Sequence, residues 1–133
     1  MTKEERYLLL KDSFARVPYG VKGINEYGNI ITLKDWKTEQ SIFDGIRYII
    51  NKYNWRPYLF PLSSMTEEQK RDLTNLFNCT VVITEWEIVF PNYYDSNMDN
   101  WNKVFNWCYK NHFDCNGLIP MGLALDATGL NIY

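Results

Sequence analysis

Three cysteines and a single histidine are the residues of this chain best suited to metal chemistry. Cys108, His112 and Cys115 follow one another as C-x3-H-x2-C, and Cys79 could supply a fourth ligand. Three thiolates and one imidazole are a ligand set that structural zinc accepts. Structural zinc sites usually contain two cysteines closer together, and reduced cysteines are often simply buried. We therefore expect no cofactor and keep these four residues as a secondary candidate set.

Acid–base or nucleophilic catalysis has few residues to draw on. His112 is the only histidine, so any histidine-based mechanism must use it, with Asp114 close by in sequence. Ser63 and Ser64 lack the G-x-S-x-G surroundings of a nucleophilic serine and are better explained as helix caps. The sequence favours a non-catalytic protein and leaves the question of an enzyme open.

Two further patterns resemble functional motifs. Glu85 and Glu87 fall on the same side of a predicted strand, as paired carboxylates in acid–base sites often do, but alternating charges are also typical of the solvated face of a strand. Gly20-Val-Lys-Gly23 has the G-x-x-G form that KH domains use to approach RNA. Because no stacking motif accompanies it, we interpret it as a strand with permissive backbone positions and do not expect a nucleic-acid partner.

The aromatic content is the strongest indication of function. The chain has 5 Trp, 10 Tyr and 7 Phe among 133 residues, more than one small core easily buries. Tyrosine and tryptophan concentrate binding energy at interfaces, so exposed ones predict a binding surface. The candidate binding residues are Tyr48, Trp55, Tyr58, Tyr93 and Tyr94.

Size and charge bound the class of protein. A chain of 133 residues with 46% hydrophobic residues is expected to form a single domain, residues 1–133, with its own core. Residues 1–60 carry ten basic and seven acidic side chains, whereas residues 61–133 carry four and nine. Neither part has a run of like charge that predicts binding to a phosphate backbone. No stretch fits a membrane span or a secretory signal, so we expect a cytoplasmic protein with reduced cysteines.

The first half of the chain is expected to form a helix, a hairpin and a second helix. Thr2 and the acidic residues after it predict a helix to about Ala15, with Tyr7, Leu10 and Phe14 on its apolar face. Short β-prone pieces from Tyr19 to Trp36 predict a hairpin. Residues 40–54 fit either a helix or a second hairpin. The helix is favoured because the apolar positions keep a period of 3.6.

The second half begins with an extended proline segment, residues 55–62. Overlapping capping boxes, Ser64 to Glu67 and Thr66 to Gln69, then predict a helix that buries three apolar side chains, Leu73, Leu76 and Phe77. Alternation from Val82 to Phe90 predicts one continuous strand. A helix is expected from Ser96 or Asn97 to about His112, and the apolar tail is expected to wrap over the core.

Together these elements predict an α+β fold, a small single domain in which a short antiparallel sheet is packed by about three helices.

Four parts of the chain also carry a resemblance: ERYLLLKDSFARVPYGVK, RPYLFPLSSMTEEQKRDL, HFDCNGLIPMGLALDAT and the terminal tyrosine. They are similar to a family of short, uncharacterised proteins encoded in phages and prophages of gut bacteria, which share a PYL-x-P-[LM]-SSMTEE core and a GLIP-x-GLA tail. The family carries no assigned activity. Cys115 and Asn116 depart from the sequence pattern of this family, and so do residues 23–54.

The resemblance implies a small accessory protein of phage or prophage origin. The shared segments would form a scaffold that leaves residues 23–54 and the NYYDSN loop free to vary, as in recognition proteins. We expect it to bind a host or phage macromolecule, most simply a protein, through an aromatic surface. The alternatives are a binder of a nucleotide-like ligand or a small enzyme, and a structural homo-oligomer.

Overall fold

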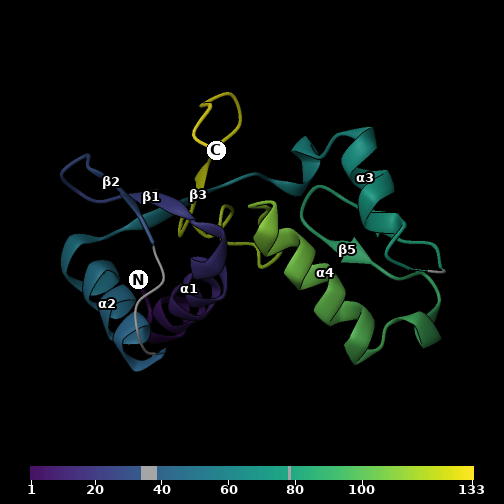
Figure 1. Ribbon diagram of the computed structural model, residues 1–133, viewed down its shortest axis with the longest axis horizontal. Coiled ribbons are helices and arrows are strands. Elements are labelled where there is room, and N and C mark those ends of the chain that lie inside the picture. The colour runs from purple at the N-terminus through teal and green to yellow at the C-terminus, as the bar shows by residue number, and fades with distance from the viewer. Residues whose placement is uncertain (34–38, 78) are drawn as a thin grey trace.

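Four α-helices and two small sheets make up the part of the chain that the computed structural model describes, residues 1–33, 39–77 and 79–133 (Figure 1). The helices are α1 (Lys3–Arg16), α2 (Glu39–Tyr53), α3 (Glu67–Thr74) and α4 (Met98–Lys110). The predicted small α+β domain is confirmed, with four helices in the described ranges instead of about three. No helix among these residues is long and apolar enough to cross a membrane.

The larger sheet has the strand order β2-β1-β3-β6. The predicted hairpin is confirmed by β1 (Lys22–Ile24) and β2 (Ile30–Thr32), which pair antiparallel, although Trp36 lies outside the described residues. β3 (Arg56–Leu59) pairs antiparallel with β1 and in parallel with β6 (Leu125–Asp126). The sheet is therefore mixed, and the prediction of an antiparallel sheet is wrong. The two-residue β6 has too little alternation to be recognised in the apolar tail.

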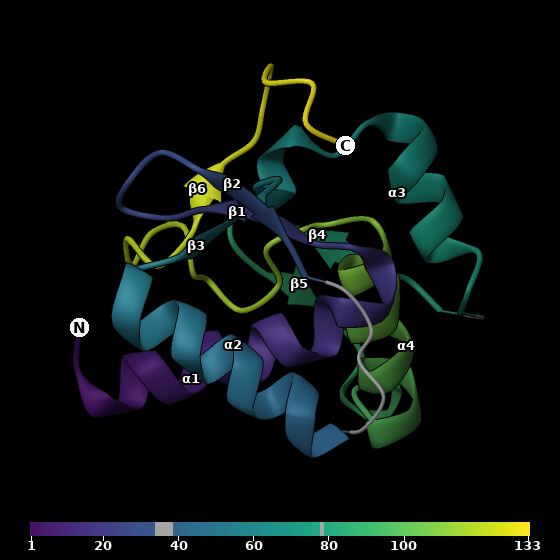
Figure 2. The same ribbon diagram turned by 60° about the vertical axis from the view of Figure 1, so that its left-hand side comes forward.

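Helices α1 and α2 lie side by side beneath this sheet (Figure 2). The helix that was favoured for residues 40–54 is confirmed, and Ile46 and Ile50 of α2 are buried in the core. Of the apolar face predicted for α1, Leu10 is buried and Phe14 packs against the core, whereas Tyr7 is exposed. Leu9 is also buried. A reciprocal capping box with Thr2 starts this helix.

Trp55 is the largest side chain in the first core. It is fully buried, and its indole Nε1 donates a hydrogen bond to the Ile31 carbonyl oxygen at 3.2 Å. Gly23 makes room for it, because a Cβ at this position would overlap the Trp55 ring and the Arg56 carbonyl oxygen. Close packing between neighbouring strands thus explains Gly23 of the G-x-x-G pattern. Gly20 ends a 3-10 turn with a φ of 66°, which glycine adopts without strain.

A second core lies between α3, α4 and a hairpin of β4 (Val82–Ile83) and β5 (Ile88–Val89). The predicted continuous strand from Val82 to Phe90 is wrong, because Thr84 turns the chain. Its backbone N–H donates to the Glu87 carbonyl at 2.8 Å, and its Oγ1 accepts from the Glu87 N–H at 3.0 Å. Side-chain hydrogen bonds of this kind compete with extended structure.

The start of α3 confirms one of the two predicted capping boxes. Thr66 and Gln69 form it reciprocally, at 3.1 and 2.9 Å. Ser64 instead lies in a short 3-10 turn and donates to the Pro61 carbonyl at 2.7 Å, so the box at Ser64 is wrong. Of the three side chains predicted to be buried, Leu76 is exposed.

Candidate functional site

The turn before α4 carries two highly exposed aromatic side chains. Tyr93 and Tyr94 are 85% and 86% exposed, and Met98, in the first turn of α4, is 76% exposed. The two tyrosine rings lie edge to face with their centroids 5.8 Å apart. We call residues 92–98 the tyrosine turn. It presents large apolar side chains to solvent, where they gain nothing from burial in the folded monomer.

Hydrogen bonds fix the backbone of the tyrosine turn. The Asn92 side chain accepts from the Tyr94 N–H at 3.0 Å, and the Asn92 carbonyl accepts from the Asp95 N–H at 3.0 Å. Asn97 caps α4 by accepting from the Asn100 N–H at 2.9 Å, so it, and not Ser96, is the cap. Short polar side chains that bond their own backbone are the expected cause of such a turn.

Two side chains of α4 form hydrogen bonds with the tyrosine turn. Asn100 Nδ2 donates to the Asp95 carbonyl at 2.8 Å, and Trp101 Nε1 donates to Ser96 Oγ at 2.9 Å. Trp101 is itself packed edge to face on Phe90, with ring centroids 5.1 Å apart. The exposed tyrosines therefore stand on a backbone that is ordered before any partner binds.

The other predicted binding residues lie elsewhere. Tyr48 is 52% exposed on α2, where its hydroxyl lies 3.5 Å from that of Tyr53. Tyr58 is half-buried in β3. Trp55 is fully buried, so its prediction as a binding residue is corrected: it is a core side chain. In Figure 1, α2 lies at the opposite end of the molecule from the start of α4. The five residues therefore do not form one surface.

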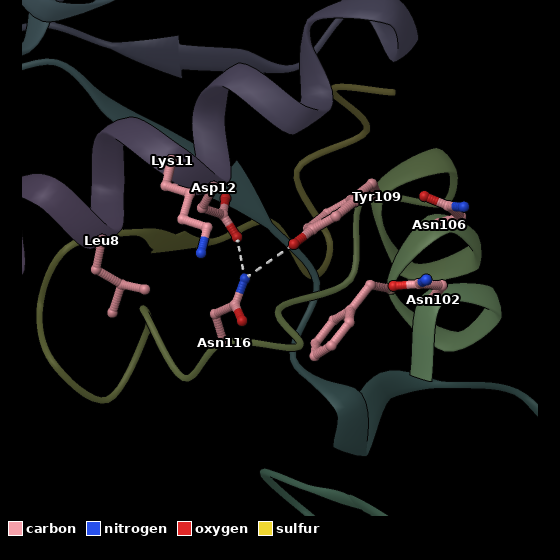
Figure 3. Close-up of a pocket in the computed structure, with 8 residues that line it drawn as sticks. Leu8, Lys11, Asp12, Asn102, Asn106, Tyr109 and Asn116 are labelled. Atoms are coloured by element: carbon pink, nitrogen blue, oxygen red, sulfur yellow. Dashed lines mark hydrogen bonds between the residues drawn. The ribbon is translucent and has the colours of Figure 1, made fainter. Parts of the chain in front are cut away.

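A groove of about 480 Å³ between α1 and α4 is a second candidate site (Figure 3). Its apolar walls include Leu8 and Phe105. Figure 3 shows the side chains of Asp12, Tyr109 and Asn116 meeting at one point in the groove. Asn116 Nδ2 donates to Asp12 Oδ2 at 2.8 Å and lies 3.4 Å from the Tyr109 hydroxyl.

A buried ion pair lies behind this groove. Arg16 Nε donates to Asp12 Oδ1 at 2.7 Å, and neither side chain is exposed. Arg16 also donates to the Phe113 carbonyl at 2.7 Å, and its guanidinium carbon lies 4.9 Å from the centre of the Tyr109 ring. Burial acts to lower the pKa of Arg16, but the charge and hydrogen bonds of Asp12 outweigh it, so the pKa is raised.

Sequence reasoning missed this cluster. The available signal was the spacing of Asp12 and Arg16, an i,i+4 ion pair on the same side of α1 as the buried Leu9. No local pattern indicates that Tyr109 and Asn116, about a hundred residues later, would meet this pair.

The cysteine and histidine set does not assemble. In the described ranges no group of three or more His, Cys, Asp or Glu side chains is arranged to hold a metal ion. Cys108 and Cys115 belong to the second core, and the hydrogen bond with the neighbouring Cys108 thiol, followed by burial, raises the pKa of Cys115. Cys79 is free and half-buried, and burial and Asp95 raise its pKa.

His112 is held by packing. Its ring stacks on that of Tyr133, and its Nδ1 is buried without a hydrogen-bond partner in the described chain. Burial, followed by the charges of Arg16 and Lys22, lowers the pKa of His112 to about 4. Asp114, the nearby carboxylate, accepts from the backbone N–H groups of Leu118 and Ile119, each at 2.9 Å, so it is occupied in shaping the tail.

The remaining candidate motifs also have structural explanations. Glu85 and Glu87 lie at the tip of the β4–β5 hairpin, both exposed, and do not share one strand. Ser64 is bonded to the Pro61 carbonyl, as described above, and Ser63 is exposed beside it.

Comparisons with models of protein families, with curated proteins and with solved structures find no match to this chain.

Proposed function

We propose that the protein is a non-catalytic binding module that recognises a protein partner through the tyrosine turn. The observation that carries this proposal is the combination of exposure and order: Tyr93 and Tyr94 are almost fully exposed, yet the backbone beneath them is fixed by hydrogen bonds. Tyrosines are enriched among the residues that dominate interface energetics. A preordered contact loses less conformational entropy on binding.

The resemblance to short phage and prophage proteins supports the context of this function. It suggests a cytoplasmic accessory protein whose partner is a host or phage protein. The NYYDSN segment is the loop that the resemblance leaves free to vary, and it is the segment that the fold displays at the start of α4. A constant scaffold with a variable loop is a common design of recognition proteins.

Site-specific cross-linking tests the proposal. A photo-reactive phenylalanine analogue is placed at position 94, and a matched one at Tyr27, which is also highly exposed but lies in the β1–β2 turn. We expect a discrete cross-linked protein from position 94 in the bacterial host and none from position 27. Equal, diffuse cross-linking from both positions would contradict the proposal.

A second candidate function is the binding of a small polar ligand in the groove between α1 and α4. The specific observation in its favour is the meeting of Asp12, Tyr109 and Asn116 beside an aromatic wall, since ligand sites combine apolar walls with a few convergent polar groups. Isothermal calorimetry with nucleosides and sugars, compared with an Asn116→Ala variant, tests it. If the heat of binding is the same for the Asn116→Ala variant and wild type, the ligand does not bind in this groove.

A further inference from the structure

A small slot between α1 and α2 complements the tyrosine turn, because it is an apolar cavity with positive charge around it. It has a volume of about 180 Å³, and its floor includes the buried side chains of Leu10 and Ile50. Three cationic side chains, Lys3, Arg6 and Arg47, line it as well. An apolar cavity of about 150 Å³ binds benzene, so the slot is on the scale of one aromatic ring.

The cations of the slot are largely unpaired. Within the described residues, Lys3 and Arg6 take part in no ion pair. Arg47 bonds Asp44 at 3.0 Å, but both side chains are about half exposed, so this pair is weak and can exchange with another carboxylate. The slot is thus apolar with a basic rim, and it can bind an apolar side chain that is flanked by acidic ones.

The tyrosine turn carries that combination. Asp95 lies within the turn and Asp99 directly after it, next to the exposed Tyr93, Tyr94 and Met98. Lys103, on the following turn of α4, lines the same small pocket as Asp95. The local excess of charge is therefore negative, opposite to that of the slot.

The two features lie at opposite ends of the molecule. In Figure 1 the α1–α2 pair is at the left end, and the start of α4, with the turn before it, is at the right end. The tyrosine turn of a molecule therefore does not reach its own slot. Two copies, however, bring one turn and one slot together, and each copy keeps a free turn or a free slot.

We propose that the tyrosine turn of one copy docks into the α1–α2 slot of the next, so that the protein assembles head to tail. One tyrosine ring enters the slot, and Asp95 and Asp99 face the cationic rim. This inference rests on the proposed function, because it uses the same turn, and it identifies one partner as a second copy of the chain. The last copy of each assembly keeps a free turn for a different protein.

Complementary variants give a direct test. Arg6→Glu reverses a rim charge without breaking an ion pair of the described chain, and Tyr94→Ala removes an exposed ring. Sedimentation equilibrium over micromolar to millimolar concentrations measures association. We expect wild-type protein to form species heavier than a monomer, more weakly at high salt, and each variant to associate about tenfold more weakly or worse. An equimolar mixture of the two variants stops at a dimer, because only one intact turn and one intact slot can meet.

Two control variants exclude general surface effects. Arg71→Glu on α3 reverses an exposed charge far along the sequence from the slot, and Tyr27→Ala removes an exposed tyrosine outside the turn. Both should associate like wild type, and all variants should keep the wild-type circular dichroism spectrum and Tm.

A monomer at every concentration overturns the inference, as does association that Arg6→Glu and Tyr94→Ala leave unchanged. These results are distinct from failure of the proposed function. A monomeric protein that still cross-links another protein from position 94 keeps the proposed function and loses only the self-assembly.

Discussion

The rings of His112 and Tyr133 stack face to face, with centroids 3.6 Å apart and planes 9° from parallel. The Tyr133 hydroxyl accepts a hydrogen bond from the Lys22 N–H and donates one to the Tyr58 carbonyl, each at 2.8 Å. The last residue of the chain is thus tied to strands β1 and β3 and to the end of α4. This stack explains why the only histidine of the chain is half-buried.

Stability should fall as the pH drops from about 6.5 to about 4. Burial and the charges of Arg16 and Lys22 lower the pKa of His112 to about 4 in the folded protein, against its ordinary value of 6.5. Between these values the unfolded chain binds a proton that the folded protein does not, so acid favours unfolding. Urea unfolding of wild type and His112→Asn across this range measures the effect; asparagine suits the positive φ of 62° at this position. An identical pH dependence for both proteins would refute the assignment to His112.

Breaking the buried Asp12–Arg16 pair should be strongly destabilising. Asp12→Asn leaves the Arg16 charge buried without its counter-ion, and removing one partner of a buried pair costs about 3–5 kcal/mol. The double variant Asp12→Leu/Arg16→Met should unfold at a higher urea concentration than Asp12→Asn, because it leaves no unpaired charge. Asp44→Asn breaks the exposed Arg47–Asp44 pair and serves as the control. If it lowered the free energy of unfolding as much as Asp12→Asn does, burial would not be the cause of the large effect.

Gly23→Ala should destabilise the fold by about 1–3 kcal/mol, the usual cost of overpacking a core. The added methyl group would overlap the Trp55 ring and the Arg56 carbonyl oxygen, and a backbone atom cannot move aside as a flexible side chain can. The shift in Tm on thermal unfolding, together with tryptophan fluorescence, reports the change. A Tm equal to that of wild type would mean that β1 and β3 are not packed this closely.

Asn100→Ala should loosen the tyrosine turn without unfolding the protein. The substitution removes the hydrogen bond from Nδ2 to the Asp95 carbonyl but none of the exposed rings. Hydrogen exchange of the Asp95 and Ser96 amides should become faster, and binding through the turn should weaken at unchanged Tm. Asn106→Ala, on an exposed position of the same helix, serves as the matched control. Unchanged exchange rates in Asn100→Ala would show that the turn is ordered by its own backbone bonds alone.

Much of the fold could be predicted because its signals are local. The capping residues Thr2, Thr66 and Asn97 and the period of residues 40–54 depend on neighbours in sequence. The hairpin at Thr84 was missed because alternation alone does not distinguish one strand from two that are joined by a side-chain-bonded turn.

The candidate sites were predicted only in part, because some of their contacts join residues that are far apart in the sequence. Exposure of Tyr93 and Tyr94 follows from a polar, turn-forming segment, and the sequence indicated it. Trp55 looked like a surface residue because its burial depends on Gly23, more than thirty positions earlier and on a neighbouring strand. The Asp12–Asn116 contact joins residues 104 positions apart, and no periodic pattern encodes such a contact.

In the function proposed above, the tyrosine turn is the contact surface for a protein partner. The most direct test is the affinity of the protein cross-linked from position 94, purified and titrated against wild type, Tyr93→Ala, Tyr94→Ala and Tyr27→Ala. We expect at least one of Tyr93→Ala and Tyr94→Ala to raise the Kd by about thirtyfold, a loss on the order of 2 kcal/mol, and Tyr27→Ala to bind like wild type. Wild-type affinity in both turn variants would contradict it.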